Sequence, residues 1–128
     1  MNKIIKIEEG VFKHKQSEYE GYIITTEKSV YNLGIDSDGQ CCESWGYLSS
    51  NDNLEEFIGA EIISVKLTDN ELFTVDTLPK IYEGDMTFFT VETDQGSFQI
   101  VAYNEHNGYY SHDVLIVVDG ELIDSELV

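Results

Sequence analysis

Two short segments hold both cysteines and two of the three histidines. Cys41 and Cys42 are adjacent, and His106 and His112 flank the segment Asn107-Gly108-Tyr109-Tyr110-Ser111. Asn-Gly is a strong tight-turn signal because both residues tolerate positive φ, so a reversal there would bring the two imidazoles towards each other. A pair of imidazoles completed by a thiolate is a ligand set that Zn²⁺ prefers. These residue types therefore point to a metal site.

The cysteine spacing differs from a standard zinc signature. Ligand cysteines usually stand roughly two to four residues apart, and consecutive side chains on an extended chain point to opposite faces. Two arrangements are open: one cysteine completed by an acid or a water, or a kinked loop that lets both thiolates reach the ion. The structural alternative has one cysteine in the core and the histidines hydrogen-bonded in a polar loop. A vicinal disulfide is disfavoured in a reducing cytoplasm.

Other patterns that carry chemistry are weak. Asp36-Ser37-Asp38-Gly39 begins like a calcium loop, but Tyr47 stands where an EF-hand has its bidentate glutamate, so we interpret it as a turn. The sequence has no Gly-rich phosphate loop, and nothing marks an oxyanion hole beside the thiols. His14, which lies between two lysines, is interpreted as a solvated residue. We therefore expect a protein that is not an enzyme.

The charge balance is strongly acidic. The 128 residues include 25 acids, seven lysines and no arginine, for a formal net charge of −18. Such a chain repels phosphate backbones, so direct binding of nucleic acid is not expected, and a basic protein surface is the favoured partner. The candidate contact residues are acids in predicted turns: Asp36, Asp38, Asp52, Glu55, Glu56, Glu83, Asp85, Asp119 and Glu121.

Length and composition predict a single domain over residues 1–128. Residues 1–16 are weakly basic, with four lysines against two glutamates, and residues 17–128 form a strongly acidic body. Hydrophobic residues make up 41% of the chain, enough for a core. No apolar run reaches the ~18 residues of a membrane helix, and no signal peptide is recognisable, so we expect a cytoplasmic protein without membrane contact.

The elements that must position these residues are mostly strands. Alternating apolar residues, rich in β-branched and aromatic types, favour a β-rich α+β or all-β fold: a mostly antiparallel β-sheet domain with one or two short helical turns. A helical turn is expected over Leu54–Ile58, ended by Gly59. Asp113–Val118 is apolar on both faces, which is typical of a central strand. The remaining strands are predicted over residues 3–8, 20–26, 29–35, 45–49, 61–68, 87–92, 97–103 and 121–124, with Ile63, Val65 and Leu67 on one face.

The two cysteine and histidine segments together resemble a known family. Cys41-Cys42-Glu43-Ser44-Trp45-Gly46-Tyr47 and His106-Asn107-Gly108-Tyr109-Tyr110-Ser111-His112 resemble motifs of small acidic proteins of unknown function found in phages and Gram-positive bacteria. The likeness covers roughly residues 20 to 118. The resemblance implies a structural zinc ion bound by Cys41, Cys42, His106 and His112. Some proteins of this kind, encoded in streptococcal prophages, are type II-A anti-CRISPR proteins that inhibit Cas9-type nucleases.

The resemblance and the charge together predict a phage-encoded inhibitor that acts in the host bacterial cytoplasm. A Cas9-type effector nuclease holds nucleic acid in a positively charged channel, and an acidic domain that mimics DNA could bind there and block target-DNA loading. One alternative is an acidic zinc-binding module that binds another basic host protein. A further alternative is a zinc-dependent hydrolase or deaminase-like enzyme, although the sequence lacks the His-x-Glu and Pro-Cys-x-x-Cys pattern of zinc deaminases.

Overall fold

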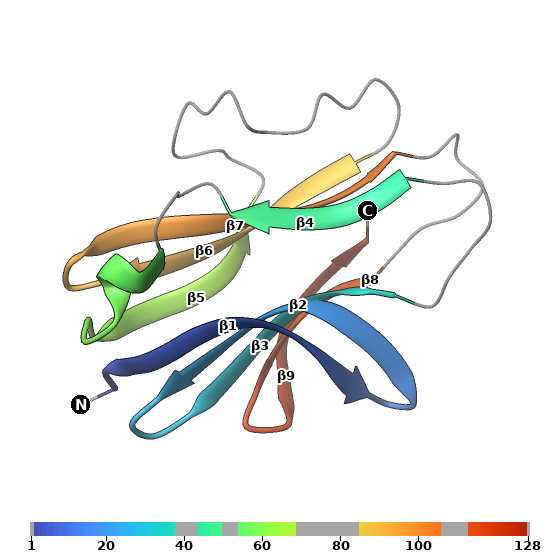
Figure 1. The fold of residues 1–128 in the computed structure, drawn as a ribbon. Coiled ribbons are helices and arrows are strands. Elements are labelled where there is room, and N and C mark those ends of the chain that lie inside the picture. The colour runs from blue at the N-terminus through green and yellow to red at the C-terminus, as the bar shows by residue number, and fades with distance from the viewer. Residues whose placement is uncertain (1, 38–43, 50–53, 69–84, 106–112, 128) are drawn as a thin grey trace.

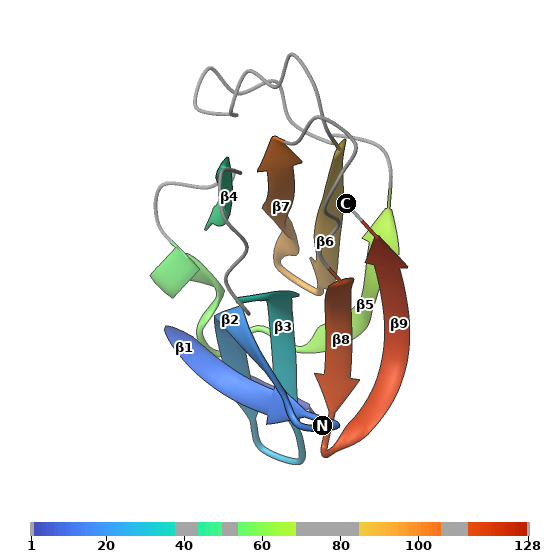
Figure 2. The same cartoon turned by 90° about the vertical axis from the view of Figure 1, so that its right-hand side faces the viewer.

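Two antiparallel β-sheets lie one against the other in the computed structural model (Figures 1 and 2), which describes residues 2–37, 44–49, 54–68, 85–105 and 113–127. The first sheet has the strand order β1-β2-β3-β8-β9 and the second has the order β4-β7-β6-β5. The described strands are β1 (Ile4–His14), β2 (Ser17–Thr26), β3 (Val30–Asp36), β4 (Ser44–Ser49), β5 (Ile62–Thr68), β6 (Asp85–Thr93), β7 (Gly96–Glu105), β8 (Asp113–Val118) and β9 (Glu121–Leu127).

The main core lies between the two sheets. Leu33, Ile35 and Ile116 face it from the first sheet, and Phe89 and Phe98 face it from the second; all five are fully buried. Burying this apolar surface on both inner faces is what holds the layers together. The expected β-rich, mostly antiparallel fold is therefore confirmed, and the structure divides it into two sheets.

A short 3₁₀ helix, η1 (Leu54–Phe57), closes one side of this core. It supplies Phe57, whose ring centroid lies 4.6 Å from that of Phe98. The predicted helical turn is confirmed, and Gly59 follows it with φ +93°, a conformation that glycine adopts without strain. The chain then returns to β1, where the N–H of Gly59 donates to the carbonyl of Ile4 over 2.8 Å.

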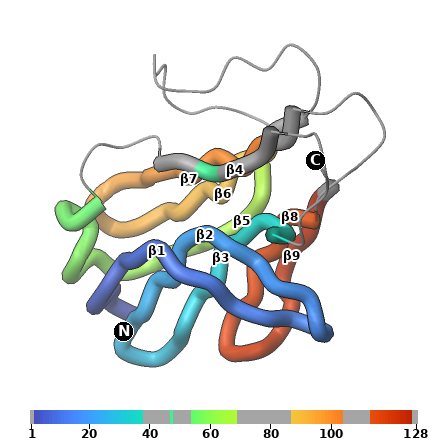
Figure 3. Tube along the Cα trace, turned by 45° about the vertical axis from the view of Figure 1, so that its right-hand side comes forward, coloured from blue at the N-terminus to red at the C-terminus, as the bar shows by residue number. Residues whose placement is uncertain are grey.

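A second, smaller core lies on the outer face of the first sheet. Gly21 pairs with Gly34 across β2 and β3, and a Cβ at position 34 would stand 2.5 Å from a ring carbon of Phe12. The missing side chain therefore lets the far end of the β1–β2 hairpin lie over the sheet, beside β8 and β9 (Figure 3). There Phe12 stacks on Tyr19 with ring centroids 5.5 Å apart, and both join a cluster that contains Leu115.

The outer core explains why the sequence of β8 is apolar on both faces. Ile116 faces the main core and Leu115 faces the hairpin end, so both sides of the strand are buried. The prediction of a central strand over Asp113–Val118 is confirmed, since β8 lies between β3 and β9. The strands predicted over residues 20–26, 29–35, 87–92, 97–103 and 121–124 are also confirmed, and they belong to the antiparallel pairs β2–β3, β6–β7 and β8–β9.

One prediction about β5 is wrong. Ile63 was expected on the same face as Val65 and Leu67, but the register with β6 shifts between Ile62 and Ser64. This bulge turns Ile62 inward at 8% exposure and Ile63 outward at 66%. Strict alternation fails because one extra residue in a strand reverses the face of every residue before it.

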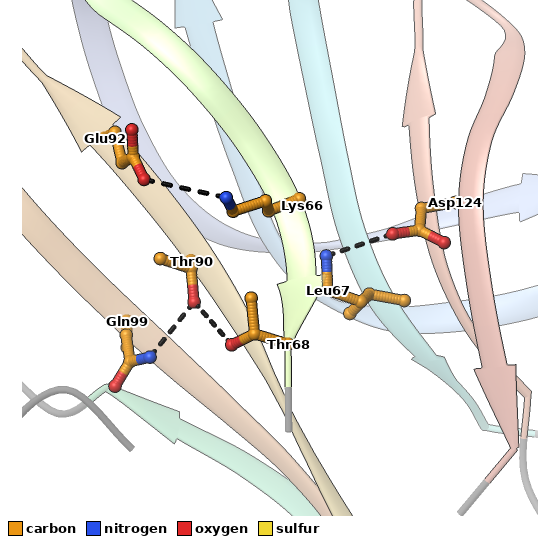
Figure 4. Close-up of polar contacts among 7 residues, drawn as sticks. All are labelled: Lys66, Leu67, Thr68, Thr90, Glu92, Gln99 and Asp124. Atoms are coloured by element: carbon orange, nitrogen blue, oxygen red, sulfur yellow. Dashed lines mark hydrogen bonds and ion pairs between the residues drawn. The ribbon is translucent and has the colours of Figure 1, made fainter. Parts of the chain in front are cut away.

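The two sheets are also linked through polar groups at one edge. Figure 4 shows the N–H of Leu67 in β5 donating to Oδ2 of Asp124 in β9 over 3.1 Å. In the second sheet, Nε2 of the fully buried Gln99 donates to Oγ1 of Thr90 over 3.0 Å, and this hydroxyl lies 2.9 Å from Oγ1 of Thr68. These bonds satisfy polar groups that would otherwise be buried without partners.

Candidate functional site

Two connections cross between the sheets at one end of the molecule. One joins β3 to β4 through residues 38–43, and the other joins β7 to β8 through residues 106–112. β3 pairs with β8 in the first sheet, and β4 pairs with β7 in the second. The two connections therefore begin and end beside each other, with neighbouring strands at both ends. The predicted metal ligands belong to these connections and lie outside the described residues: Cys41, Cys42, His106 and His112.

The strand register fixes how close together the connections are anchored. Ser44, the first residue of β4, is opposite Glu105, the last residue of β7. In the other sheet Ile35 is opposite Val114, each one residue from its strand end. Opposite Cα atoms of an antiparallel pair are about 4.5–5.5 Å apart. The fold thus anchors the cysteine and histidine segments side by side at both ends, although they are far apart in the sequence.

This proximity is compatible with a metal site that bridges the two connections. Zinc sites commonly take ligands from segments that are distant in sequence but adjacent in the fold, and such a site ties those segments together. Among the residues that the structure does describe, no group of three or more His, Cys, Asp or Glu side chains is arranged to hold a metal ion.

The predicted partner-binding acids are spread over the molecule. Glu55 and Glu56 are exposed in η1, and Asp119 and Glu121 are exposed around the β8–β9 turn. Asp36 ends β3 at the opposite end of the first sheet, beside the two connections. Asp38, Asp52 and Glu83 lie outside the described residues, and Asp85 begins β6 without a described side chain.

Asp119 has a structural role in the turn that holds it. Its Oδ1 accepts a hydrogen bond of 2.9 Å from the N–H of Val30, and its own N–H donates to the carbonyl of Val30 over 3.0 Å. These bonds connect the β8–β9 turn to the first residue of β3. Asp119 itself adopts φ +51°, a left-handed conformation that aspartate tolerates better than most residues.

A cluster of tyrosines and carboxylates was missed by the sequence reasoning. Tyr22 of β2 and Tyr47 of β4 meet edge to face across the two sheets, with ring centroids 5.8 Å apart. The hydroxyl of Tyr22 donates to Oε1 of Glu9 over 3.4 Å. Glu20, on β2, lies near enough to act on Tyr47. We call Glu9, Glu20, Tyr22 and Tyr47 the tyrosine–glutamate cluster.

Burial and nearby carboxylates change the electrostatics of the two tyrosines in this cluster. Partial burial, and then the negative charge of Glu9, raises the pKa of Tyr22 to about 12. Partial burial, and then Glu9 and Glu20, also raises the pKa of Tyr47. A negative potential beside aromatic rings attracts ammonium and guanidinium groups. In the sequence, this cluster is visible only as tyrosines and glutamates within three strands. The pairing of β1 with β2 and the approach of β4 bring these side chains together in the fold.

Comparison with known proteins places the chain in a family. Residues 1–116 match the family described as Domain of unknown function (DUF7448). The chain belongs to the DUF7448 family. No curated protein and no solved structure matches it. The matched region runs from β1 into β8 and includes both connections, whereas β9 lies outside it.

Family membership bears out a resemblance to proteins of unknown function, and it assigns the DUF7448 protein no activity. In the described part of the chain, no helix has both the length and the apolar character needed to cross a membrane. The charge and the geometry of the chain itself are therefore the basis for assigning a function.

Proposed function

We propose that this protein acts by binding, as a phage-encoded anti-CRISPR protein that inhibits a type II Cas9-type effector nuclease stoichiometrically. The observation that supports this proposal is its charge. With 25 acids against seven lysines, the surface stays negative even if every lysine pairs with an acid. Lys6 pairs with Glu8 at 2.7 Å and Lys66 with Glu92 at 3.8 Å, in both cases between exposed side chains that solvent screens.

The proposed mechanism is occlusion of the surface that loads DNA. A Cas9-type effector holds its nucleic acid in a positively charged channel and contacts mainly the backbone. Carboxylates of the inhibitor replace phosphates in that channel, so target DNA is excluded. Because exposed charges are screened within a Debye length of about 8 Å at physiological salt, binding weakens as salt concentration rises.

The tyrosine–glutamate cluster supplies the specific part of this contact. Tyrosine is enriched at binding hot spots because it combines a large apolar body with a polar tip. Tyr22 and Tyr47 come from different sheets and are held by the core, so the cluster is preorganised. Its proposed ligand is an arginine or lysine side chain of the nuclease.

A structural zinc ion is part of the same proposal. Cys41, Cys42, His106 and His112 would hold it, and the neighbouring anchors of the two connections support this choice of ligands. A bound zinc supplies folding free energy by fixing both connections. If all four residues bind the ion, no coordination position stays open, which fits a structural role and not a catalytic one.

The test is target cleavage by a streptococcal Cas9-type nuclease loaded with guide RNA, with the inhibitor added before or after the target DNA. We expect inhibition only when the protein is added first, at about one inhibitor per nuclease, and weaker inhibition at high salt. No inhibition in either order, across several orthologues, would refute the proposal. The protein would then be an acidic module for another basic host protein.

Matched variants separate the cluster from the total charge. Glu9→Gln/Glu20→Gln removes two charges from the cluster, and Glu55→Gln/Glu56→Gln removes two from η1. The first variant should raise the half-inhibitory concentration at least about tenfold, as expected for loss of a hot spot, and the second should raise it by less. Equal effects would show that only the net charge matters.

A further inference from the structure

A cavity of about 330 Å³ opens on the outer face of the first sheet, where the β1–β2 hairpin end meets β8 and β9. Its walls combine polar groups and leucines. His14, Lys15 and Ser17 come from the hairpin, Asp113 and Leu115 from β8, and Leu122 from β9. A volume in this range suits a small organic molecule, and a mostly preformed concave site with a few polar groups is the usual form of a ligand pocket.

One polar atom of a residue that lines this cavity has no hydrogen-bond partner. Nε2 of His14 is buried and forms no hydrogen bond. His14 was interpreted from the sequence as solvated, but the residue is half-buried and its Nε2 is shielded from solvent, at the place where the hairpin end meets β8 and β9. Buried polar atoms are nearly always hydrogen-bonded, so His14, which lines the cavity, keeps an unused hydrogen-bonding atom beside it.

The turn beside His14 is strained. Lys15 and Gln16 form the two-residue turn of the hairpin, with φ angles of +50° and +73°. Such turns favour Asn-Gly, because other residues disfavour the left-handed region. Strained backbone of this kind persists mainly at sites where it positions a functional group. Here it places Lys15, a cation in a strongly acidic protein, at the wall of the cavity.

We propose that this cavity binds a small aliphatic monocarboxylate. Its carboxylate is held by the ammonium of Lys15 and the imidazole of His14, and its hydrocarbon part lies against Leu115 and Leu122. Asp113, also at the wall, repels a second negative charge, so dicarboxylates and inorganic phosphate bind more weakly. This site is separate from the proposed nuclease contact and does not depend on it.

The test is an NMR titration of the full chain with 4-methylpentanoate, 4-methylpentylamine, succinate and inorganic phosphate. We expect saturable shifts of the His14 imidazole and of the Leu115 and Leu122 methyl signals with 4-methylpentanoate only. Two results would overturn the proposal. One is the absence of a saturable shift up to tens of millimolar, where binding would be too weak to be specific. The other is equal binding of the amine, succinate or phosphate.

Two lysine variants test the head-group contact. Lys15→Gln should weaken binding of 4-methylpentanoate about two- to fivefold, as expected for loss of an exposed ion pair. Lys28→Gln is the matched control, because Lys28 is an exposed lysine in the β2–β3 turn and should leave the affinity unchanged. Equal affinity of Lys15→Gln and the native chain would contradict the assignment of Lys15. Unchanged amide signals outside the turn would show that the variant is folded.

Discussion

The carboxylate of Asp124 accepts a hydrogen bond from the backbone N–H of Leu67 at 3.1 Å, which joins the edge strand of one sheet to the edge strand of the other. An unpaired edge is a site for unwanted strand pairing, so this bond both links the layers and covers a free donor.

Replacing Asp124 by alanine should therefore destabilise the protein. We expect the free energy of unfolding to fall by about 1–2 kcal/mol, because the N–H of Leu67 loses its acceptor in a partly buried position. Urea denaturation measures the change. Glu126→Ala, an exposed acid on the same strand, is the control and should stay within about 0.5 kcal/mol of the native chain. Equal effects of the two variants would contradict a structural role for Asp124.

Gly10 and Gly21, both in the β1–β2 hairpin, should differ sharply in their tolerance of replacement by alanine. A Cβ at Gly21 would stand 1.9 Å from the carbonyl oxygen of Leu33, which belongs to the backbone, whereas one at Gly10 would meet the flexible tip of Ile23 at 2.6 Å. Gly21→Ala should lower the free energy of unfolding by about 3 kcal/mol or more, and Gly10→Ala by roughly 1 kcal/mol. Thermal unfolding compares them. A well-folded Gly21→Ala variant would show that the sheet can shift there.

Tyr22 should make the protein less stable at high pH. Its pKa is raised from 10.0 to about 12 in the folded protein, so folding favours the protonated form. The contribution of protonated Tyr22 to the free energy of unfolding is complete below pH 10, and it is lost as the pH rises from 10 towards 12. Absorbance at the tyrosinate band, as the difference between the native chain and Tyr22→Phe, gives the titration. Glu9→Gln should move this pKa downward, and an unchanged pKa would refute the contact.

The metal prediction links zinc content to stability. The purified protein should contain about one zinc per chain, and His106→Ala or Cys42→Ser should lower both the zinc content and the melting temperature, the latter by about 5 °C or more. Metal analysis and thermal unfolding check this. His14→Gln, which changes the histidine outside the predicted ligand set, should keep its zinc. A chelated protein that melts at the native temperature would exclude a structural metal.

The strained turn predicts a substitution that stabilises the chain. Lys15→Asn/Gln16→Gly places the residues that tolerate positive φ in a two-residue hairpin turn. The free energy of unfolding should rise by about 1–2 kcal/mol, since left-handed φ is disfavoured for other residues. Urea denaturation measures the gain. An unchanged stability would mean that contacts of the native side chains already compensate the strain.

The candidate sites were only partly predictable from the sequence. Cys42 and His106 attracted attention by residue type, and the fold then anchored their segments on adjacent strands. Tyr22 and Glu9 gave no such signal, because their contact arises from the pairing of β1 with β2. The flanking lysines suggest a solvated His14, and nothing local shows that the hairpin end lies over β8, where Nε2 of His14 is buried.

The sequence by itself determined the local elements and the charge. Period-two alternation and turn residues such as Asp119-Gly120 act between close neighbours, so the strands and hairpins were readable along the chain. The tertiary structure alone decided the division into two sheets, the bulge at Ile63 and the curl of the first hairpin. These depend on packing between residues far apart in sequence, such as Phe12 over Gly34, and long-range close contacts leave no periodic signal in a single chain.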